Sequence, residues 1–462
     1  SSRGLKKDFE CSMVYHIIES GANHMGKSNS KLIYILLLLL ILTVAGAVFF
    51  YLEWEDPQIA LSEDIEMIPA HSKFTATFRD MKSGIRSYRV VLLQDKQEYI
   101  VAEEDFLHRG NFEKTADIEI VASNLKIKDG PAQLQIRVID FSPLKNSTSL
   151  IKDVTIDSVP PKVGLVSTSH YINPGGSCLV IYTASDDAAT NGVRFGETLF
   201  PGYKTRINGE PSYASYIAVP LEVDSNTLMT VVARDKAGNE SLAPVVYHLR
   251  NHSFRSDKVN VSKNFMNGKA TQFQSMDTSL TGKSPLEVFV YLNETLREAN
   301  NQKIYELCGK TEDKRLWNGA FLRMKNAANM ARFGDKRTYV FEGKDVGKSI
   351  HRGIDLASVR HATIQAANSG KVLFAGDIGI YGNTVIIDHG QGLASLYAHL
   401  SSIAVQEGQD IARGAVIGKS GATGFAGGDH LHFSILIHGI FVDPIEWWDA
   451  HWIHDNVELK LK

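Results

Sequence analysis

A long run of apolar residues stands out near the start of the chain. Residues 32–52 carry no charge, and only Thr43 and two tyrosines bring a polar group into the run. A helix of this length measures about 30 Å, which matches the hydrocarbon core of a bilayer. A buried core helix is rarely apolar on every face over such a length. The pattern therefore predicts a transmembrane helix at residues 32–52.

The charges on either side of this run predict its orientation. Two lysines precede it and three acidic residues follow it: Lys27, Lys31, Glu53, Glu55 and Asp56. By the positive-inside tendency, residues 1–31 form a cytoplasmic tail and everything after residue 52 is exported. A cleavable signal peptide is the alternative, because residues 45–47 are small. We favour the retained anchor, because the apolar run continues beyond the point where a cleaved signal would end.

From residue 57 to about residue 250, short alternating apolar stretches are separated by turn residues, a pattern typical of β-sandwiches. Two strand-to-turn segments repeat each other 95 residues apart, at Asp140 and Asp235. A seven-strand sandwich takes about 100 residues. The spacing therefore predicts two sandwich domains, at residues 57–158 and 159–250.

The second of these turns, from Asp235 to Asn239, resembles a turn of the immunoglobulin-like modules of bacterial surface proteins; the first copy departs from it. Such a fold carries no function by itself. We expect the two modules to act as a spacer or as a docking arm for an envelope protein partner.

Between about residues 254 and 335 the apolar spacing becomes helical. Ser284, Pro285 and Glu287 fit a capping box with proline at the first helical position. An apolar face then recurs at Leu286, Phe289, Leu292 and Leu296. A second helix is predicted at residues 316–331. We expect this face to pack against a neighbouring domain; a lid over an active site is the alternative.

Three histidine motifs follow in a stretch of short strands punctuated by glycines. They are His351-x-Gly353-x-Asp355, Tyr397-x-His399-Leu400 and His430-Leu431-His432-Phe433. Strand periodicity places His430 and His432 on one face of one strand. Hydrolytic zinc sites use three protein ligands of the histidine and carboxylate type and keep one position open. His351, Asp355 and one histidine of the pair can supply such a set.

Over residues 337–450 the chain resembles the lysostaphin/LytM family of zinc endopeptidases. Every metal and catalytic position of the family pattern is present, together with Gly421, Thr423 and Gly424 before the third motif. The resemblance implies an antiparallel-β domain in which His351, Asp355 and His432 bind Zn²⁺. It also implies that His399 and His430 flank the water and the scissile carbonyl. Ser434 departs from the glutamate of many members, which leaves substrate detail open.

Other histidines and aromatic residues receive simpler interpretations. His361, His389 and His438 have no partner motif, so we expect surface or supporting positions rather than metal ligands. Four aromatic residues could line a substrate groove, although packing is the more common role for each one singly. These are Phe374, Tyr381, Trp447 and Trp448.

Composition and charge narrow the class of partner. The chain has 462 residues, a formal net charge of -3 and three cysteines. The length indicates several domains, and the charge disfavours nucleic acid as a partner. Cysteines so few and scattered build no disulfide framework or thiolate zinc cluster. Cys178 could pair with Cys308, but two separate buried thiols are the favoured expectation.

We therefore expect a mainly β, multidomain protein with a transmembrane helix, two sandwiches, a helical segment and a C-terminal peptidase domain. It would lie in the bacterial inner membrane with its catalytic domain in the periplasm, and would hydrolyse the peptides of peptidoglycan. The main alternative is a non-catalytic LytM-type regulator of other wall hydrolases, in which metal ligands are typically degraded. A scaffold for an envelope assembly, which needs no zinc, is a third possibility.

Overall fold

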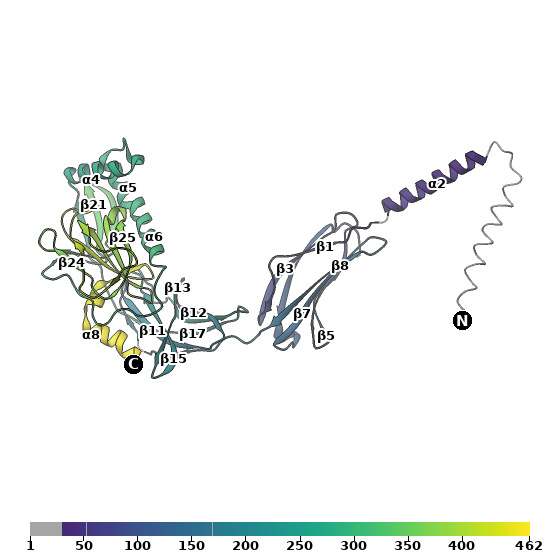
Figure 1. Ribbon diagram of the computed structural model, residues 1–462, viewed down its shortest axis with the longest axis horizontal. Coiled ribbons are helices and arrows are strands. Elements are labelled where there is room, and N and C mark those ends of the chain that lie inside the picture. The colour runs from purple at the N-terminus through teal and green to yellow at the C-terminus, as the bar shows by residue number, and fades with distance from the viewer. Residues whose placement is uncertain (1–29, 52, 169) are drawn as a thin grey trace. The chain divides into compact units, whose positions relative to one another are not determined.

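The computed structural model describes residues 30–51, 53–168 and 170–462 (Figure 1). Within it the chain divides into two compact units, Ser1–Val159 and Pro160–Lys462. Residues 1–29, which hold most of the predicted cytoplasmic tail and Cys11, lie outside the described residues.

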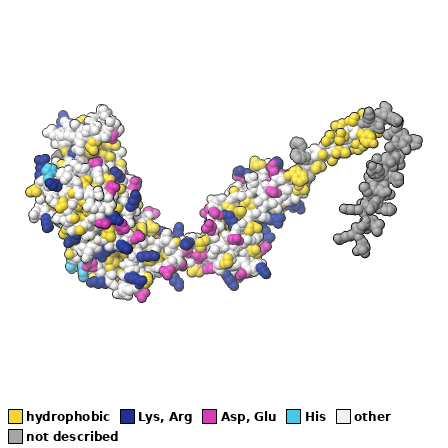
Figure 2. All heavy atoms as spheres, viewed as in Figure 1, with side chains coloured by type: hydrophobic (Ala, Val, Ile, Leu, Met, Phe, Trp, Pro, Cys, Tyr) yellow, Lys and Arg dark blue, Asp and Glu magenta, His cyan; other side chains and the backbone are white. Residues whose placement is uncertain are grey.

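Helix α2 (Ser30–Tyr51) forms where the apolar run predicts a helix, and it has 22 residues. Apolar side chains cover it (Figure 2), and residues 32–42 are exposed. Nevertheless, no helix in the described part of the chain meets the requirements of length and apolarity for crossing a membrane. The predicted transmembrane helix at residues 32–52 is therefore not supported, and its last residue, Leu52, lies outside the described residues.

The first unit contains two sheets that share one apolar core. The smaller sheet has the order β1-β3-β6 and the larger the order β2-β8-β7-β4-β5. The strands are β1 (Gln58–Leu61), β2 (Met67–Ile68), β3 (His71–Arg79), β4 (Ile85–Gln94), β5 (Gln97–Asp105), β6 (Glu113–Val121), β7 (Gly130–Asp140) and β8 (Ser147–Ile156). Alternate residues of both sheets, such as Phe78, Val90 and Ile136, meet in the core. This is the sandwich that the alternating pattern predicts.

Two four-stranded sheets of the second unit form another sandwich, with the orders β14-β15-β11-β9 and β13-β12-β16-β17. Their strands are β9 (Val163–Leu165), β11 (Ser177–Ala184), β12 (Ala188–Phe195), β13 (Thr198–Pro201), β14 (Tyr203–Ile207), β15 (Glu210–Ala218), β16 (Met229–Asp235) and β17 (Glu240–Pro244). Asp140 ends β7 and Asp235 ends β16, so the predicted repeat places both aspartates at equivalent strand ends. The finer resemblance to immunoglobulin-like modules is not confirmed.

Helices α4 (Lys263–Met276), α5 (Pro285–Tyr291) and α6 (Arg297–Leu307) make up the helical segment, with a π-helical turn, η2 (Leu292–Leu296), before α6. The predicted capping box is confirmed. The Ser284 hydroxyl accepts from the Glu287 N–H at 3.3 Å, and the Glu287 carboxylate accepts from the Ser284 N–H at 2.7 Å. In Figure 1 these helices lie beside β21 (Lys336–Phe341) and β25 (Gly370–Asp377).

The helix predicted at residues 316–331 is wrong. That segment is extended, and it ends in strand β20 (Ala328–Ala331). Its N–H groups bond outside the segment, from Leu316 to the His389 carbonyl and from Phe321 to the Trp447 carbonyl. Trp317 and Phe321 are both buried and lie four residues apart, a spacing that resembles the period of a helix. Both nevertheless insert into the core from an extended chain.

The C-terminal part is built on an eight-stranded sheet whose paired strands are all antiparallel, as the resemblance implies. Its order is β20-β23-β31-β27-β26-β25-β29, with β32 beside β31. The remaining bounds are β22 (Lys344–Ile350), β23 (Ile354–Ala357), β26 (Asn383–Asp388), β27 (Leu393–Leu400), β29 (Asp410–Ile411), β31 (Leu431–Ile437) and β32 (Ile440–Val442). A smaller sheet joins β19 (Ser256–Asn260), β21 and β22.

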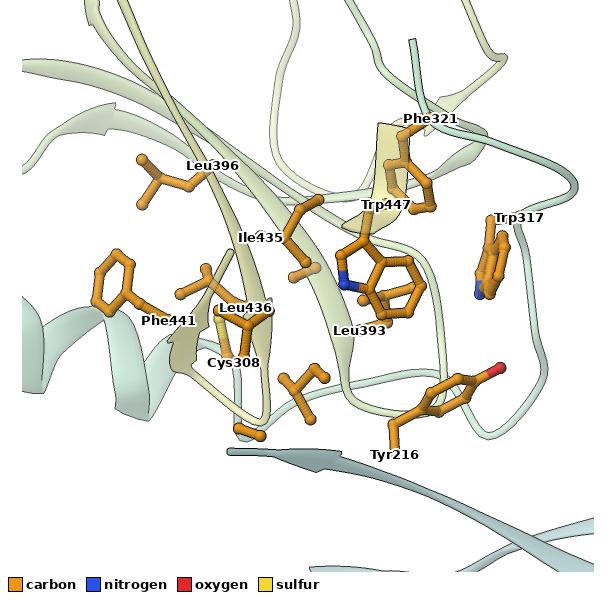
Figure 3. Packing of buried hydrophobic residues seen from close by; sticks show 14 of the residues in the cluster. Tyr216, Cys308, Trp317, Phe321, Leu393, Leu396, Ile435, Leu436, Phe441 and Trp447 are labelled. Atoms are coloured by element: carbon orange, nitrogen blue, oxygen red, sulfur yellow. The ribbon is translucent and has the colours of Figure 1, made fainter. Parts of the chain in front are cut away.

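Trp447, in helix α7 (Pro444–Trp448), joins this domain to the second sandwich. Figure 3 shows its indole among Trp317, Phe321 and Tyr216. The indole N–H donates to the Ser177 hydroxyl at 2.9 Å. Cys178 and Cys308 are both buried and free, so the expectation of separate thiols is confirmed.

Candidate metal centre

Strands β23 and β31 bring the first and third histidine motifs together. Asp355 and His432 are direct cross-strand partners, and His351 lies just after β22. His351 Nε2 is 3.0 Å from Asp355 Oδ1 and 3.1 Å from His432 Nδ1, and His432 Nδ1 is 2.9 Å from Asp355 Oδ1. These are the three residues that the resemblance implies as zinc ligands.

Hydrogen bonds on the outer side of each ring fix where the lone pairs point. His351 Nδ1 lies 2.9 Å from the Arg332 carbonyl, which can only accept, so Nε2 keeps the free lone pair. His432 Nε2 lies 3.1 Å from the Ser434 hydroxyl, which donates its own proton to the Arg352 carbonyl at 2.9 Å. The ring therefore donates from Nε2 and presents Nδ1 inward.

Three lone-pair atoms thus converge within 3.1 Å of one another. Ligand atoms about 2.0–2.1 Å from a tetrahedral zinc lie about 3.3 Å apart, so the donor set fits Zn²⁺ in spacing and in chemistry. Burial raises the pKa of Asp355, but the imidazoles around it outweigh burial and hold that pKa well below its usual range. The carboxylate is therefore ionised, as a ligand must be.

Two small residues make this approach possible. A Cβ at Gly353 would lie 2.6 Å from His432 Nε2 and from Ser434 Oγ, so no larger residue fits there. Ser434 is fully buried and orients His432. The sequence associated Ser434 with substrate detail; its contacts instead give it a role in orienting a metal ligand, which only the ring geometry reveals.

His399 reaches the centre through an irregularity in β27. Ala398 and His399 together oppose Thr384 of β26, which makes a bulge, and His399 has a positive φ of 61°. Bulges re-aim side chains, and such backbone conformations cluster at functional sites. His399 Nδ1 donates to the Thr423 carbonyl at 2.9 Å, which leaves Nε2 with a lone pair. Burial first, and then the neighbouring imidazoles, hold the pKa of His399 well below its usual value.

His430 lies on the same face as His432, as the strand period predicts. Its Nδ1 donates to the Gly428 carbonyl at 2.8 Å, and its Nε2 is 3.5 Å from Asp355 Oδ1. The His430 and His399 rings are 4.8 Å apart. Burial lowers the pKa of His430, but the Asp355 carboxylate outweighs burial and the net shift is upward. The two flanking histidines therefore differ in proton affinity.

A cavity of about 450 Å³ opens onto this centre. The helical segment lines one side of it with Ser262, Phe265 and Phe289, so this segment packs at the site as well as against the core. Arg337, from β21, lies 3.5 Å from Asp355 Oδ2 and was not identified from the sequence. No motif marks Arg337; strand pairing alone brings it there.

The remaining histidines stay outside the centre. His361 contacts the Ser401 hydroxyl at 3.0 Å. His389 is fully buried, with bonds to the Ser369 carbonyl and the Ser395 hydroxyl, so of the two expected positions the surface one is wrong for it. His438 stacks on Tyr203.

Of the four aromatic residues considered for a groove, Tyr381 lines the cavity. Trp447 is core and Trp448 stacks on Phe433. Phe374 contacts the Lys303 ammonium through its ring. Packing is thus the main role of this set, as expected for single aromatic residues.

Comparisons with known proteins match the part of the chain that holds this centre. The model of Peptidase family M23 matches residues 349–444. DD-carboxypeptidase/endopeptidase Mpg of Neisseria meningitidis serogroup B is 42% identical over 96 residues, which are 21% of this chain and 22% of that protein. Peptidoglycan DD-endopeptidase ShyB of Vibrio cholerae is 34% identical over 114 residues, 25% of this chain and 26% of that protein.

Among solved structures, the catalytic domain of lysostaphin from Staphylococcus simulans is 28% identical, with 27% of this chain and 92% of that chain covered and a TM-score of 0.23. The chain spans about a quarter of the length of the two curated relatives. Its C-terminal part, residues 349–444, is a Peptidase family M23 domain.

Proposed function

We propose that this chain is a zinc-dependent endopeptidase that hydrolyses peptide stems or cross-links of bacterial peptidoglycan. The observation that carries the proposal is the convergence of His351 Nε2, Asp355 Oδ1 and His432 Nδ1 within 3.1 Å, beside an open cavity. The substrate class is supported by the similarity to a peptidoglycan DD-endopeptidase.

His351, Asp355 and His432 would hold the metal. Bound zinc supplies a Lewis acid that polarises a carbonyl and acidifies water. The Arg332 carbonyl and the Ser434 hydroxyl keep the two imidazoles in the tautomers that binding requires.

His399 and His430 would handle protons beside the metal. His399 presents an unprotonated Nε2, because its Nδ1 proton is held by the Thr423 carbonyl and burial keeps the ring neutral. It is suited to accept a proton, and once protonated it can donate a hydrogen bond to a developing oxyanion. His430 holds a proton more readily beside Asp355 and can return one to the leaving amine.

The cavity wall suits an extended peptide. An apolar cluster on one side consists of Phe265, Phe289 and Phe425. The centre of the Phe425 ring lies 5.6 Å from that of Phe265 and 5.5 Å from that of Phe289. Arg337 and Arg352 add positive charge on the same cavity. Peptides that carry carboxylates would therefore be attracted to it.

Digestion of purified peptidoglycan tests the proposal. The full chain should release muropeptides that mass spectrometry identifies as products of peptide-bond cleavage, and Asp355→Ala should release none. His361→Ala is the matched control, because His361 lies outside the centre. Wild-type protein that holds zinc, releases nothing and stimulates another hydrolase would establish the regulator instead.

Location forms part of the same proposal, since peptidoglycan lies outside the cytoplasm. Residues after position 52 would then be extracytoplasmic and attached to the inner membrane. Protease added to spheroplasts should digest them. Resistance to protease in intact spheroplasts, or a soluble protein with a new N-terminus near residue 48, would refute this arrangement.

A further inference from the structure

Three carboxylates converge at one end of the first sandwich, outside the three histidine motifs. They come from Glu53, from Asp80 just after β3, and from Asp140 at the end of β7, and one oxygen of each lies within 4.8 Å of the others. Asp80 is 5% exposed and Asp140 is fully buried. Like charges so close repel one another; Asp80 Oδ1 accepts from the N–H groups of Lys82, Ser83 and Gly84, and a cation among the three carboxylates would relieve the repulsion.

The neighbouring cationic side chains form their ion pairs with other acids, one of which, Glu55, lines the same small cavity. Arg79 pairs with Glu113 at 2.8 Å, and Lys82 pairs with Glu55 at 2.9 Å. Among the ion pairs of the described residues, none joins Glu53, Asp80 or Asp140 to a lysine or arginine within 4.0 Å. Beside the cluster, a small cavity of about 90 Å³ is lined by four acids and one arginine: Glu53, Glu55, Asp56, Asp80 and Arg79. Its lining is therefore predominantly acidic.

One buried oxygen lacks a partner altogether. Asp140 Oδ1 accepts from the Ser142 N–H at 3.0 Å and from the Ser142 hydroxyl at 2.7 Å. Asp140 Oδ2 is buried and has no hydrogen-bond partner in the described part of the chain. A buried carboxylate oxygen without a donor or cation costs free energy, which indicates that a ligand completes this site.

The corresponding turn of the second sandwich satisfies its aspartate within the chain. Asp140 N–H donates to the Asn146 carbonyl at 3.1 Å, and Asp235 N–H donates to the Asn239 carbonyl at 3.2 Å, so each asparagine holds the same place. The Asn239 amide then donates to Asp235 Oδ2 at 2.8 Å. Both oxygens of Asp235 are satisfied within the chain.

In the first sandwich the asparagine is turned away from its aspartate. The Asn146 amide donates to the carbonyls of Glu53 and Glu55, at 3.0 and 3.2 Å. This contact fixes Glu53 beside the cluster and at the same time leaves Asp140 Oδ2 bare. The two turns thus differ in what the asparagine amide binds. In the second sandwich it binds the aspartate, and in the first it binds backbone carbonyls, so that the aspartate keeps an oxygen available for a ligand.

We propose that Glu53, Asp80 and Asp140 bind a divalent cation, and that this cation is Ca²⁺. All the side-chain donors are carboxylate oxygens, which hard cations prefer and which differ from the nitrogen-rich set of the peptidase centre. Ca²⁺ accepts irregular oxygen sets, whereas Mg²⁺ demands near-octahedral geometry. The bound ion would tie the chain at residue 53 to the turns after β3 and β7.

Calorimetric titration with CaCl₂ tests the site on the full chain, loaded with zinc and freed of other divalent cations. Wild-type protein should bind one Ca²⁺. Glu53→Gln and Asp140→Asn should each weaken binding by at least about tenfold, since each removes one ligand charge. Asp235→Asn is the matched control and should bind Ca²⁺ like the wild type.

Several results would overturn the proposal. They are no binding of Ca²⁺ by the wild type, binding of Mg²⁺ in preference to Ca²⁺, or unchanged affinity in Glu53→Gln. Glu53 is only half-buried, so Glu53→Gln should fold even if Asp140→Asn does not; circular dichroism checks both. Because zinc content and muropeptide release are measured on the same samples, failure of the calcium site is distinguishable from failure of the peptidase.

Discussion

Asp355 and Asp140 are both largely buried aspartates in β-strands, but their neighbours differ in kind. Asp355 Oδ1 is within 3.0 Å of His351 Nε2 and His432 Nδ1. Asp140 instead shares its surroundings with two other carboxylates. The first set mixes nitrogen and oxygen donors, which suits Zn²⁺, and the second is all oxygen, which suits Ca²⁺.

A third buried acid completes the comparison. Glu446 accepts from the Asn173 amide at 2.8 Å and from the Ser177 N–H at 2.7 Å, both neutral donors. Burial raises the pKa of Glu446 to about 7, against these hydrogen bonds. The neutral donors do not offset the effect of burial, so the pKa of Glu446 lies near neutral pH. The imidazoles around Asp355 do offset it and hold the pKa of that carboxyl well below its usual range. The neighbours of a buried acid, more than its burial, decide its role.

The largest effect is expected from removing a ligand of the nitrogen-rich centre. His351→Ala should lose most bound zinc and lower muropeptide release on the order of 10³-fold, because the Lewis acid supplies several kcal/mol. Plasma mass spectrometry of the purified protein measures the zinc. The control His361→Ala should change neither quantity, and a zinc-replete, active His351→Ala protein would contradict the ligand assignment.

His399→Ala separates proton handling from metal binding. Zinc should remain near-stoichiometric, while turnover falls about 10²- to 10⁴-fold. Metal analysis beside the muropeptide assay distinguishes the two. A zinc-free variant would make His399 a ligand, and a fully active one would remove it from the mechanism.

Ser434→Ala tests the orientation of His432. Without the hydroxyl at 3.1 Å, His432 Nε2 loses its acceptor, and zinc affinity should fall about 10- to 100-fold. Competition with a chelator of known affinity measures this change. Ser401→Ala is the matched control, since Ser401 contacts His361 at 3.0 Å in the same manner but outside the centre. Equal zinc affinity in both variants would refute the positioning role.

The smallest effect concerns Glu446 and stability. Its pKa is higher in the folded chain, about 7, than its ordinary value of 4.5. Folding therefore favours the protonated form, so its contribution is complete below pH 4.5 and is lost as pH rises to about 7. A pKa shift of this size corresponds to at most about 3 kcal/mol in the free energy of unfolding. We expect that free energy to fall by about 1 to 2 kcal/mol as the pH rises through this range.

Urea unfolding of the wild type and of Glu446→Gln across this pH range measures the difference. The variant cannot ionise at position 446, so its unfolding free energy should fall less with pH than that of the wild type. Glu222→Gln, at an exposed glutamate, serves as control. Identical slopes in wild type and Glu446→Gln would contradict the assignment.

Local patterns were sufficient for much of the candidate centre. The strand period of two placed His430, just before β31, and His432 on one face, and the motif spacing identified His351 and Asp355. The capping box at Ser284 was equally readable. In these cases the interacting groups are close in sequence, or a strand or helix period determines their directions.

Tertiary structure decided what depends on pairing between distant segments. Trp317 and Phe321 carried a helical period, yet an extended chain buries them because its N–H groups find partners on other segments. The role of Ser434 depends on the tautomer of His432, and Glu53, Asp80 and Asp140 meet only where the sandwich closes. The sequence therefore showed which side chains could bind a metal or transfer a proton. Only the fold determined which groups surround each of them, because those groups come from distant segments.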